Sequence, residues 1–207
     1  LKAVREVTAD EDIPLIFDEV VTGFRVSENC AQGLYGINPD MTTLGKILGG
    51  GMPVSAFGGR EDIMDVGAPK GQGMLDIAAT FGTFSCLSGS MVSGITTLKL
   101  LEDGKVLEGV RKYGEKLKKG FEEAFEANGI PAAITGVGSM QGLHFIDRKD
   151  IKDVWDLEGE DKTRINGFNY HLMNNGVFNR AMSFHPSAAH DDTDLEKSIA
   201  AAESFKG

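Results

Sequence analysis

The chain has 207 residues, enough for one large domain or two small ones. Its 31 acidic side chains outnumber the 21 basic ones, so the formal net charge is −10. A protein this acidic lacks the positive surface that binds nucleic acids or anionic membranes, so we expect neither as a partner. Hydrophobic residues make up 41% of the chain, which is ordinary for a globular protein.

Two cysteines, Cys30 and Cys86, are too few for a disulfide framework, so we expect reduced thiols in a cytoplasmic protein. The four histidines lack the paired spacing of metal-binding motifs, and no metal site is expected. No apolar stretch near the start suggests a signal peptide. The chain opens at Leu1 and reads like the middle of a longer protein. A natural cleavage, a cloned fragment or an incomplete gene would all look this way.

The first part of the chain has the pattern of an α/β sheet. Residues 1–8 have a weak helical spacing. Residues 13–17 are continuously apolar, which predicts a short strand buried on both faces, as in parallel sheets. Two more short strands are predicted at 41–44 and 54–57. The first strand ends at Asp18, and ligands bind α/β sheets at the carboxyl ends of the strands.

Helices dominate the later part. Apolar residues recur every three or four positions over 87–101 and over 110–125, which predicts two amphipathic helices. A composition change near Pro131 places our predicted domain boundary between residues 1–130 and 131–207. Beyond this boundary we predict a pair of glycine-punctuated strands over 134–146, a helix over 165–172, and a last helix that starts with a capping box of Thr193 and Glu196.

Three side chains lie where a ligand could be bound, and each also has a simpler explanation. Asp18 caps a loop or pairs with a structural arginine, or it meets a cationic group of a ligand, because a buried carboxylate needs a partner. Lys46 precedes three glycines, and is either a surface lysine or a nucleophile in an apolar, glycine-lined pocket. Thr83 precedes a helix, and either caps it or helps to bind a phosphate.

Together these three side chains predict one cofactor, pyridoxal 5′-phosphate. The lysine would form a Schiff base with the aldehyde of the cofactor, and the aspartate would keep the pyridine nitrogen protonated. The ring then withdraws electrons from the bound substrate. The same combination of amine, carboxylate and phosphate-binding hydroxyl fits no metal or dinucleotide motif in this chain.

Two stretches resemble the signature motifs of the class III pyridoxal-phosphate-dependent aminotransferases. They are residues 15–25, Leu-Ile-Phe-Asp-Glu-Val-Val-Thr-Gly-Phe-Arg, and residues 36–46, Gly-Ile-Asn-Pro-Asp-Met-Thr-Thr-Leu-Gly-Lys, which is continued by Gly-Gly-Gly-Met-Pro at 49–53. The 28-residue spacing from Asp18 to Lys46 also fits this family. The resemblance is closest to the glutamate-1-semialdehyde 2,1-aminomutase branch, and the chain looks like the C-terminal half of such a protein.

This resemblance implies an α/β fold of fold-type I, with part of a large, mostly parallel domain followed by a small α+β domain. It implies that Lys46 is the catalytic lysine, that Asp18 pairs with the ring nitrogen, and that Val20 packs on the ring. Thr83 would reach the cofactor phosphate of the other subunit in a homodimer. The substrate would be a small amino acid or amine.

The motifs leave the reaction open. An aminomutase returns the amino group to the same molecule, an aminotransferase passes it to a second substrate, and a related racemase does neither. Met182 lies where we expect an acidic residue in the mutases, and Cys86, Leu87 and Ser88 replace the family's Gly-Asn-Pro. The glycine-rich segment 67–79 is a candidate lid. A fragment that keeps the fold and dimer surface without catalysis is a further alternative. We expect the isolated chain to be poorly soluble or to associate in an unusual way.

Overall fold

The computed structural model describes residues 1–67, 78, 82–179 and 183–207. Backbone contacts divide the chain into two compact units, Leu1–Gly104 and Lys105–Gly207, and each unit is described by itself. Both units combine strands with helices, as the sequence predicts. No helix in the described ranges is both long enough and apolar enough to cross a membrane.

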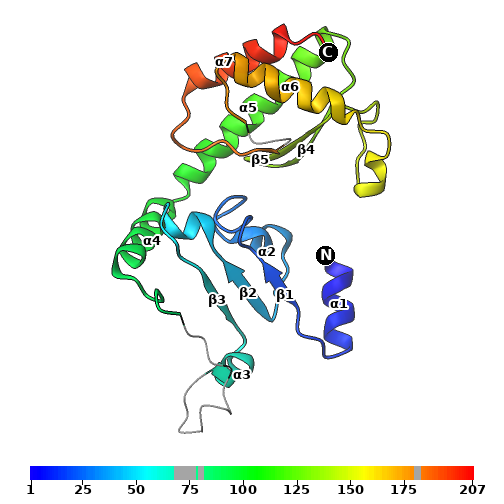
Figure 1. Cartoon of the computed structure of the whole chain (residues 1–207). Helices are drawn as coiled ribbons and strands as arrows, with labels where there is room; N and C mark the ends of the chain where they lie inside the picture. Colours follow the sequence, from blue (N-terminus) through cyan, green and yellow to red (C-terminus); the bar gives the residue numbers. More distant parts are fainter. Residues whose placement is uncertain (68–77, 79–81, 180–182) are drawn as a thin grey trace. The chain divides into compact units, whose positions relative to one another are not determined.

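The first unit is built on a three-stranded sheet with the order β1-β2-β3 (Figure 1). The strands are β1 (Ile16–Asp18), β2 (Met41–Leu44) and β3 (Ala56–Gly59). The first two run parallel, with Asp18 opposite Thr43, and β3 runs antiparallel to β2. The carboxyl ends of β1 and β2 therefore lie at the same edge of the sheet.

The expectation that the first strand is buried on both faces is wrong. Ile16 in β1 is 55% exposed, and the side chain of Asp18 is exposed as well. The reason is that β1 is an edge strand of this sheet and only three residues long, so little of it is covered within the unit. The apolar run correctly predicts a strand but not its surroundings.

Helices and short turns surround the sheet of the first unit. They are α1 (Lys2–Asp10), α2 (Cys30–Tyr35), η1 (Lys46–Gly49), α3 (Glu61–Met64), η2 (Asp65–Gly67) and α4 (Ser88–Leu101). The predicted helix over 87–101 corresponds to α4. Its glycine-containing inner face packs on η1, where a Cβ on Gly94 would lie 3.0 Å from the carbonyl oxygen of Leu48.

A buried carboxylate, Asp40, joins three parts of this unit. It accepts hydrogen bonds from the backbone N–H of Leu15 at 2.8 Å, from Arg5 at 2.7 Å and from Arg60 at 2.9 Å. These bonds connect α1, the start of β1 and the residue after β3 to the start of β2. The Leu15 N–H, followed by the two arginines, holds the pKa of Asp40 well below its usual range.

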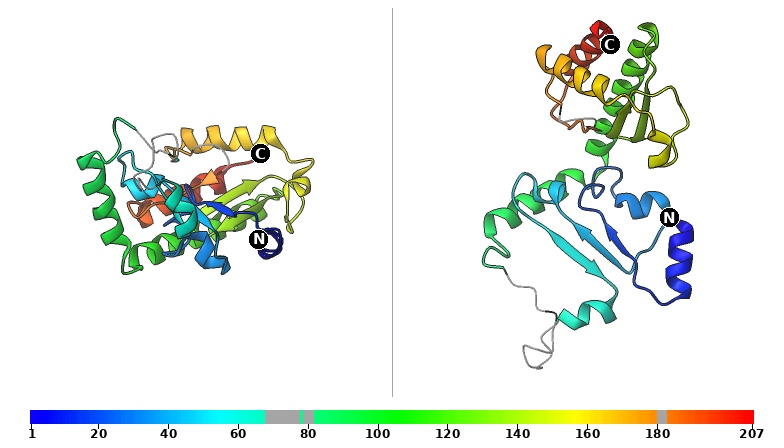
Figure 2. Two further views of the ribbon diagram at one scale, coloured as in Figure 1. Left: turned by 90° about the horizontal axis from the view of Figure 1, so that it is seen from below. Right: turned by 45° about the vertical axis from the view of Figure 1, so that its right-hand side comes forward.

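The second unit is an antiparallel sheet, order β4-β5-β6, combined with three long helices (Figure 2). The strands are β4 (Ala133–Val137), β5 (Met140–His144) and β6 (Ser183–Phe184), the helices are α5 (Lys105–Ala127), α6 (Lys162–Asn174) and α7 (Asp192–Ser204), and η4 (Val154–Leu157) is a short turn. The core contains edge-to-face phenylalanine contacts, among them Phe121 with Phe168 and Phe125 with Phe145. Such pairs add about 0.5–1.5 kcal/mol each beyond their buried area.

The boundary between the compact units differs from the predicted boundary at 130–131. The units part at Gly104–Lys105, so α5 belongs to the second unit. Its buried residues Leu117, Phe121 and Phe125 pack into the core formed with α6 and α7. The composition change at Pro131 follows the end of α5, and the division into domains 1–130 and 131–207 stays a prediction.

The start of α7 also differs from the prediction. Its N-cap is Asp191, whose carboxylate accepts hydrogen bonds from the backbone N–H groups of Thr193 and Asp194. Asp194 completes the capping box by accepting from the N–H of Asp191 at 3.2 Å. The predicted pair, Thr193 and Glu196, therefore lies inside the helix, because the aspartate two residues earlier takes the capping position.

Candidate active site

The parallel pairing of β1 and β2 brings two of the predicted site residues to one edge. Asp18 is the last residue of β1 and lies opposite Thr43. Lys46 follows the end of β2 after a single residue, Gly45. Backbone hydrogen bonding continues past Asp18, because the N–H of Glu19 donates to the carbonyl oxygen of Thr43 at 2.9 Å. An amine and a carboxylate thus follow adjacent parallel strands, where α/β sheets bind ligands.

One of the two oxygens of the Asp18 carboxylate accepts hydrogen bonds from the protein itself. Its Oδ1 accepts hydrogen bonds from the N–H of Val20 at 2.9 Å and from the hydroxyl of Thr43 at 3.3 Å. The expectation that this carboxylate is buried is wrong, because β1 is an edge strand. No arginine or lysine in the described ranges forms an ion pair with it. The turn-capping explanation therefore holds for Oδ1, and Oδ2 is left for a ligand.

Lys46 has a strained backbone and an exposed side chain. Its φ is +48°, in the left-handed region that costs a non-glycine residue roughly 1–2 kcal/mol. Such strain is typical of functional positions. The expected apolar pocket around this lysine is not found, because its side chain is exposed within this chain. Its amino group makes no ion pair with any described residue.

Val20 lies beside the lysine-bearing turn. A Cβ on the buried Gly45 would come within 3.4 Å of Val20 Cγ1, so the valine side chain packs on the residue just before Lys46. The turn after β1 also packs closely on the end of β2, since a Cβ on Gly23 would meet the carbonyl oxygen of Glu19 at 2.6 Å and Leu44 Cδ2 at 2.8 Å. The valine is therefore placed at the same sheet edge as Asp18 and Lys46, as its predicted role requires.

Of the three glycines after Lys46, Gly50 lies against α4. Gly50 has φ +56°, and a Cβ on it would overlap the hydroxyls of Thr97 and Ser93. The carbonyl oxygen of Gly50 accepts a hydrogen bond from Ser93 Oγ at 3.2 Å. Gly51 faces open space. The backbone of Gly50 thus closely approaches a helix of the same unit.

Thr83 lies in an exposed turn before α4, next to Phe84, which is 81% exposed. The explanation that Thr83 caps the helix is wrong, because the N-cap residue is Leu87, whose side chain makes no capping hydrogen bond. In the first turn of α4, Ser90 Oγ is buried and has no hydrogen-bond partner among the described residues. The first turn of this helix therefore carries one unsatisfied hydroxyl among the described residues, and the phosphate role of Thr83 stays a prediction.

Sequence reasoning missed Glu19, which organises the loop after β1. This glutamate is 1% exposed and accepts hydrogen bonds from the hydroxyl of Thr22 and from the N–H groups of Ala31 at 3.0 Å and Gln32 at 2.7 Å. It thereby caps the start of α2. Burial is the main cause that raises the pKa of the neighbouring Cys30 thiol, and the Glu19 charge adds to it. The only signal in the sequence is its place directly after Asp18.

Two predicted features fall largely outside the described residues. Of the candidate lid 67–79, only Gly67 and Ala78 are described, and Met182 is not. Over the described ranges, no group of three or more histidine, cysteine, aspartate or glutamate side chains could hold a metal ion. Both cysteines are free, with Cys30 buried and Cys86 exposed.

The side chains present fit pyridoxal phosphate by their chemistry. A primary amine at Lys46 suits its aldehyde, an available carboxylate oxygen at Asp18 suits a protonated ring nitrogen, and Val20 offers an apolar face. The uncapped start of α4 offers N–H groups to a phosphate.

Comparison with known proteins agrees with this chemistry. A family model described as "Aminotransferase class-III" matches residues 1–201. The chain is 38% identical over 206 residues to a glutamate-1-semialdehyde 2,1-aminomutase from Nitrosospira multiformis, and 40% identical over 205 residues to one from Archaeoglobus fulgidus. It covers 47% of each relative, and these alignments cover 98% and 97% of the chain, respectively.

Among solved structures, the fold is similar to an omega-transaminase from Sphaerobacter thermophilus. The TM-score is 0.86 at 30% identity, over 98% of this chain and 46% of the other. The chain therefore spans about half the length of the proteins that it matches. The predicted fold-type I class and the predicted cofactor, pyridoxal phosphate, are confirmed at the level of the family. The chain belongs to the class III aminotransferases.

Proposed function

We propose that this chain is the lysine-bearing half of a pyridoxal-phosphate enzyme that transfers an amino group within one substrate, like a glutamate-1-semialdehyde 2,1-aminomutase. The observation that carries the proposal is the parallel register of β1 and β2, which sets Asp18 and Lys46 at one sheet edge. The two aminomutase relatives support the intramolecular reaction.

The residues at this edge divide the work between them. When bound, pyridoxal phosphate supplies an aldehyde carbon that exchanges amines and a ring that withdraws electrons. Lys46 Nζ would hold the aldehyde carbon, give way to the substrate amine, and then carry a proton between carbon atoms of the substrate. Asp18 Oδ2 would hold a proton on the ring nitrogen, while Oδ1 stays bonded to Val20 N–H and to Thr43.

A second candidate is amino transfer between two substrates. The similarity to the omega-transaminase, with a TM-score of 0.86, favours it. The two candidates differ in one measurable product, because intermolecular transfer releases a keto compound and the mutase reaction does not. A racemase would release none either, but it would invert a stereocentre.

We also propose a homodimer in the cytoplasm, with Thr83 reaching the cofactor phosphate bound by the partner. The turn that carries Thr83 is exposed, and Phe84 beside it leaves 81% of its surface uncovered. An aromatic side chain so exposed is typical of a protein interface. Sedimentation of the chain with and without pyridoxal phosphate tests this part of the proposal.

The cofactor part is tested by reductive labelling. The purified 207-residue chain is mixed with pyridoxal phosphate, reduced with borohydride, and mapped by peptide mass spectrometry. We expect the pyridoxyl label on Lys46, loss of this label in Lys46→Arg, and strongly reduced labelling in Asp18→Ala. Asp10→Ala, at an exposed acidic position of α1, is the matched control and should label like the unaltered chain. Labels spread over surface lysines in proportion to their exposure would contradict the proposal.

A further inference from the structure

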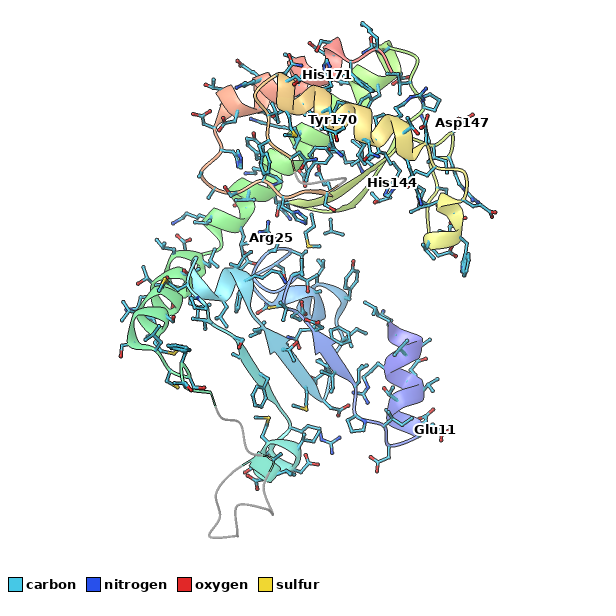
Figure 3. The ribbon with its side chains drawn as sticks, viewed as in Figure 1. Glu11, Arg25, His144, Asp147, Tyr170 and His171 are labelled. Carbon is cyan, nitrogen blue, oxygen red and sulfur yellow. The ribbon has the colours of Figure 1, made fainter. Side chains whose placement is uncertain are left out.

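Arg25 lies in the loop that follows β1, on the carboxyl side of the sheet (Figure 3). This is the edge at which β1 ends in Asp18 and at which Lys46 follows β2. The loop enters this position through a tight turn, in which the N–H of Arg25 donates to the carbonyl oxygen of Thr22 at 3.1 Å. The arginine thus comes from the same structural edge as the candidate active site.

The backbone around Arg25 is held in place from both sides. Phe24, directly before it, has φ +56°, a left-handed conformation that a phenylalanine adopts only under constraint. The buried Glu19 binds Thr22 on one side of Arg25 and the N–H groups of Ala31 and Gln32 on the other. These hydrogen bonds fix the backbone position of Arg25, and a binding residue requires a fixed backbone.

The Arg25 guanidinium differs from every other arginine that the structure describes. The five others each lie within 4.0 Å of a carboxylate: Arg5 and Arg60 at Asp40, Arg111 at Glu115, Arg148 at Asp156 and Arg164 at Asp161. The side chain of Arg25 makes no hydrogen bond or ion pair with any residue in the described ranges. It is nevertheless half-buried, and this burial lowers the pKa of the guanidinium.

A half-buried and unpaired guanidinium is costly, because the covered part of its five N–H donors loses water without gaining acceptors. An anion that enters beside it would recover these bonds. A carboxylate fits best, because its two oxygens match the planar fork of arginine with two parallel hydrogen bonds. An arginine at the edge that carries the reactive lysine is therefore suited to a substrate that bears both an amine and a carboxylate.

We propose that Arg25 binds the carboxylate of the substrate, and that the site consequently takes amino acids in preference to simple amines. This inference rests on the proposed function, since it assumes that Lys46 receives the substrate amine. The opposing possibility is that a carboxylate side chain from another copy of the chain satisfies Arg25. These two sources of the same chemistry give different results in the experiment below.

The first measurement needs no cofactor. The side-chain Nε–H signal of Arg25 is followed by ¹⁵N NMR while propionate is added to the 207-residue chain, and propionamide serves as the uncharged probe. We expect a saturable shift with propionate only. Arg25→Gln should abolish saturable propionate binding, and Arg25→Lys should weaken it by about tenfold or more, because it keeps the charge and loses the fork. Arg111→Gln, an exposed arginine of α5, is the matched control and should bind propionate unchanged.

The second measurement separates this inference from the proposed function. Pyridoxal phosphate bound to Lys46 is displaced with β-alanine or with propylamine, in the unaltered chain and in Arg25→Gln. The loss of borohydride labelling at Lys46 measures the displacement by each amine. We expect β-alanine to be preferred by the unaltered chain, and the preference to vanish in Arg25→Gln while borohydride labelling of Lys46 persists. Labelling of Lys46 with equal treatment of both amines would overturn the role of Arg25 and leave the proposed function standing.

Failure of Lys46 labelling in the unaltered chain would overturn the proposed function, and with it this inference. An oligomer that dissociates in Arg25→Gln, without any propionate binding by the unaltered chain, would show that a protein carboxylate is the true partner and would also overturn the inference.

Discussion

The hydroxyl of Thr43 donates a hydrogen bond to Asp18 Oδ1 at 3.3 Å, across the parallel pairing of β2 with β1. Two strands of three and four residues thereby orient the carboxylate that we assign to the ring nitrogen of the cofactor. With Oδ1 held by Thr43 and by the Val20 N–H, the other oxygen is presented to a ligand.

Loss of this hydroxyl should weaken cofactor binding. Replacing Thr43 by valine removes one hydrogen bond to Asp18 and should raise the Kd of pyridoxal phosphate about two- to tenfold, the usual worth of one such bond. Absorbance titration measures this Kd. Thr42→Val is the control, because its hydroxyl bonds Gln32 instead at 3.2 Å. An equal effect of both variants would contradict the assigned role of Thr43.

The strain at Lys46 predicts an unusual order of stability. Lys46→Gly and Lys46→Ala both remove the amine, but only glycine adopts φ +48° without cost. We expect the glycine variant to be more stable than the alanine variant by about 1 kcal/mol, as measured by urea unfolding. Both variants should lose borohydride labelling at this position. A more stable alanine variant would mean that the left-handed turn is absent in solution.

Gly50 should tolerate substitution less well than Gly51. Gly50→Ala introduces a Cβ that overlaps Thr97 and Ser93 and also fixes a left-handed φ, so we expect a loss of about 2–4 kcal/mol in unfolding free energy. Gly51→Ala is the comparison, because it has positive φ but open space around it, and about 1–2 kcal/mol is expected. Equal losses at both positions would rule out the contact with α4.

The pH dependence of stability should report on Asp40. Its folded-state pKa is lowered, so its contribution is fully present above the pKa of the unfolded chain, about 3.9, and is lost as the pH falls below that value. Asp40→Asn should therefore destabilise the chain strongly at pH 7 and progressively less towards pH 3. Urea midpoints across this range measure the difference. Arg5→Gln, which removes one partner at 2.7 Å, should make the acid transition begin at a higher pH. A difference between the unaltered chain and Asp40→Asn that does not change with pH would contradict this assignment.

Two variants distinguish the observed N-cap of α7, Asp191, from the predicted capping box of Thr193 and Glu196. Asp191→Ala should cost about 1 kcal/mol, because it removes the acceptor for the N–H groups of Thr193 and Asp194. Thr193→Ala should change the unfolding free energy by less than half of that amount, since threonine lies inside the helix. The reverse order would support the capping box at Thr193 and Glu196 that the sequence pattern predicts.

Much of the architecture could be predicted from local patterns. The recurrence of apolar residues locates α4 and α5 correctly, and glycine punctuation locates β4 and β5, because each pattern reflects the period of its own element. The placement of Asp18 and Lys46 at one edge also follows from sequence, since Asp18 ends the first predicted strand and Lys46 comes shortly after the second. Contacts between distant residues were harder to predict. The Asp40 ion pairs span 35 and 20 residues, and no local pattern encodes them.

The site was predicted less completely, for two physical reasons. The left-handed φ of Lys46 is a property of the folded backbone, so the residue type alone does not reveal it. The roles of Glu19 and Arg25 depend on which partners each side chain has or lacks. Burial at Asp18 and Lys46 was overestimated, because an apolar run predicts a strand without showing what covers it.

The open edge of β1 is a surface through which two copies of this chain should associate in solution. One side of β1 pairs with β2, and no strand in the described ranges pairs with its other side. Unpaired backbone donors and acceptors on an edge strand act as a template for another chain. Self-association through such an edge grows with the square of the protein concentration, whereas intramolecular folding does not depend on it. Dilution should therefore preserve single chains, and crowding should convert them into extended sheets.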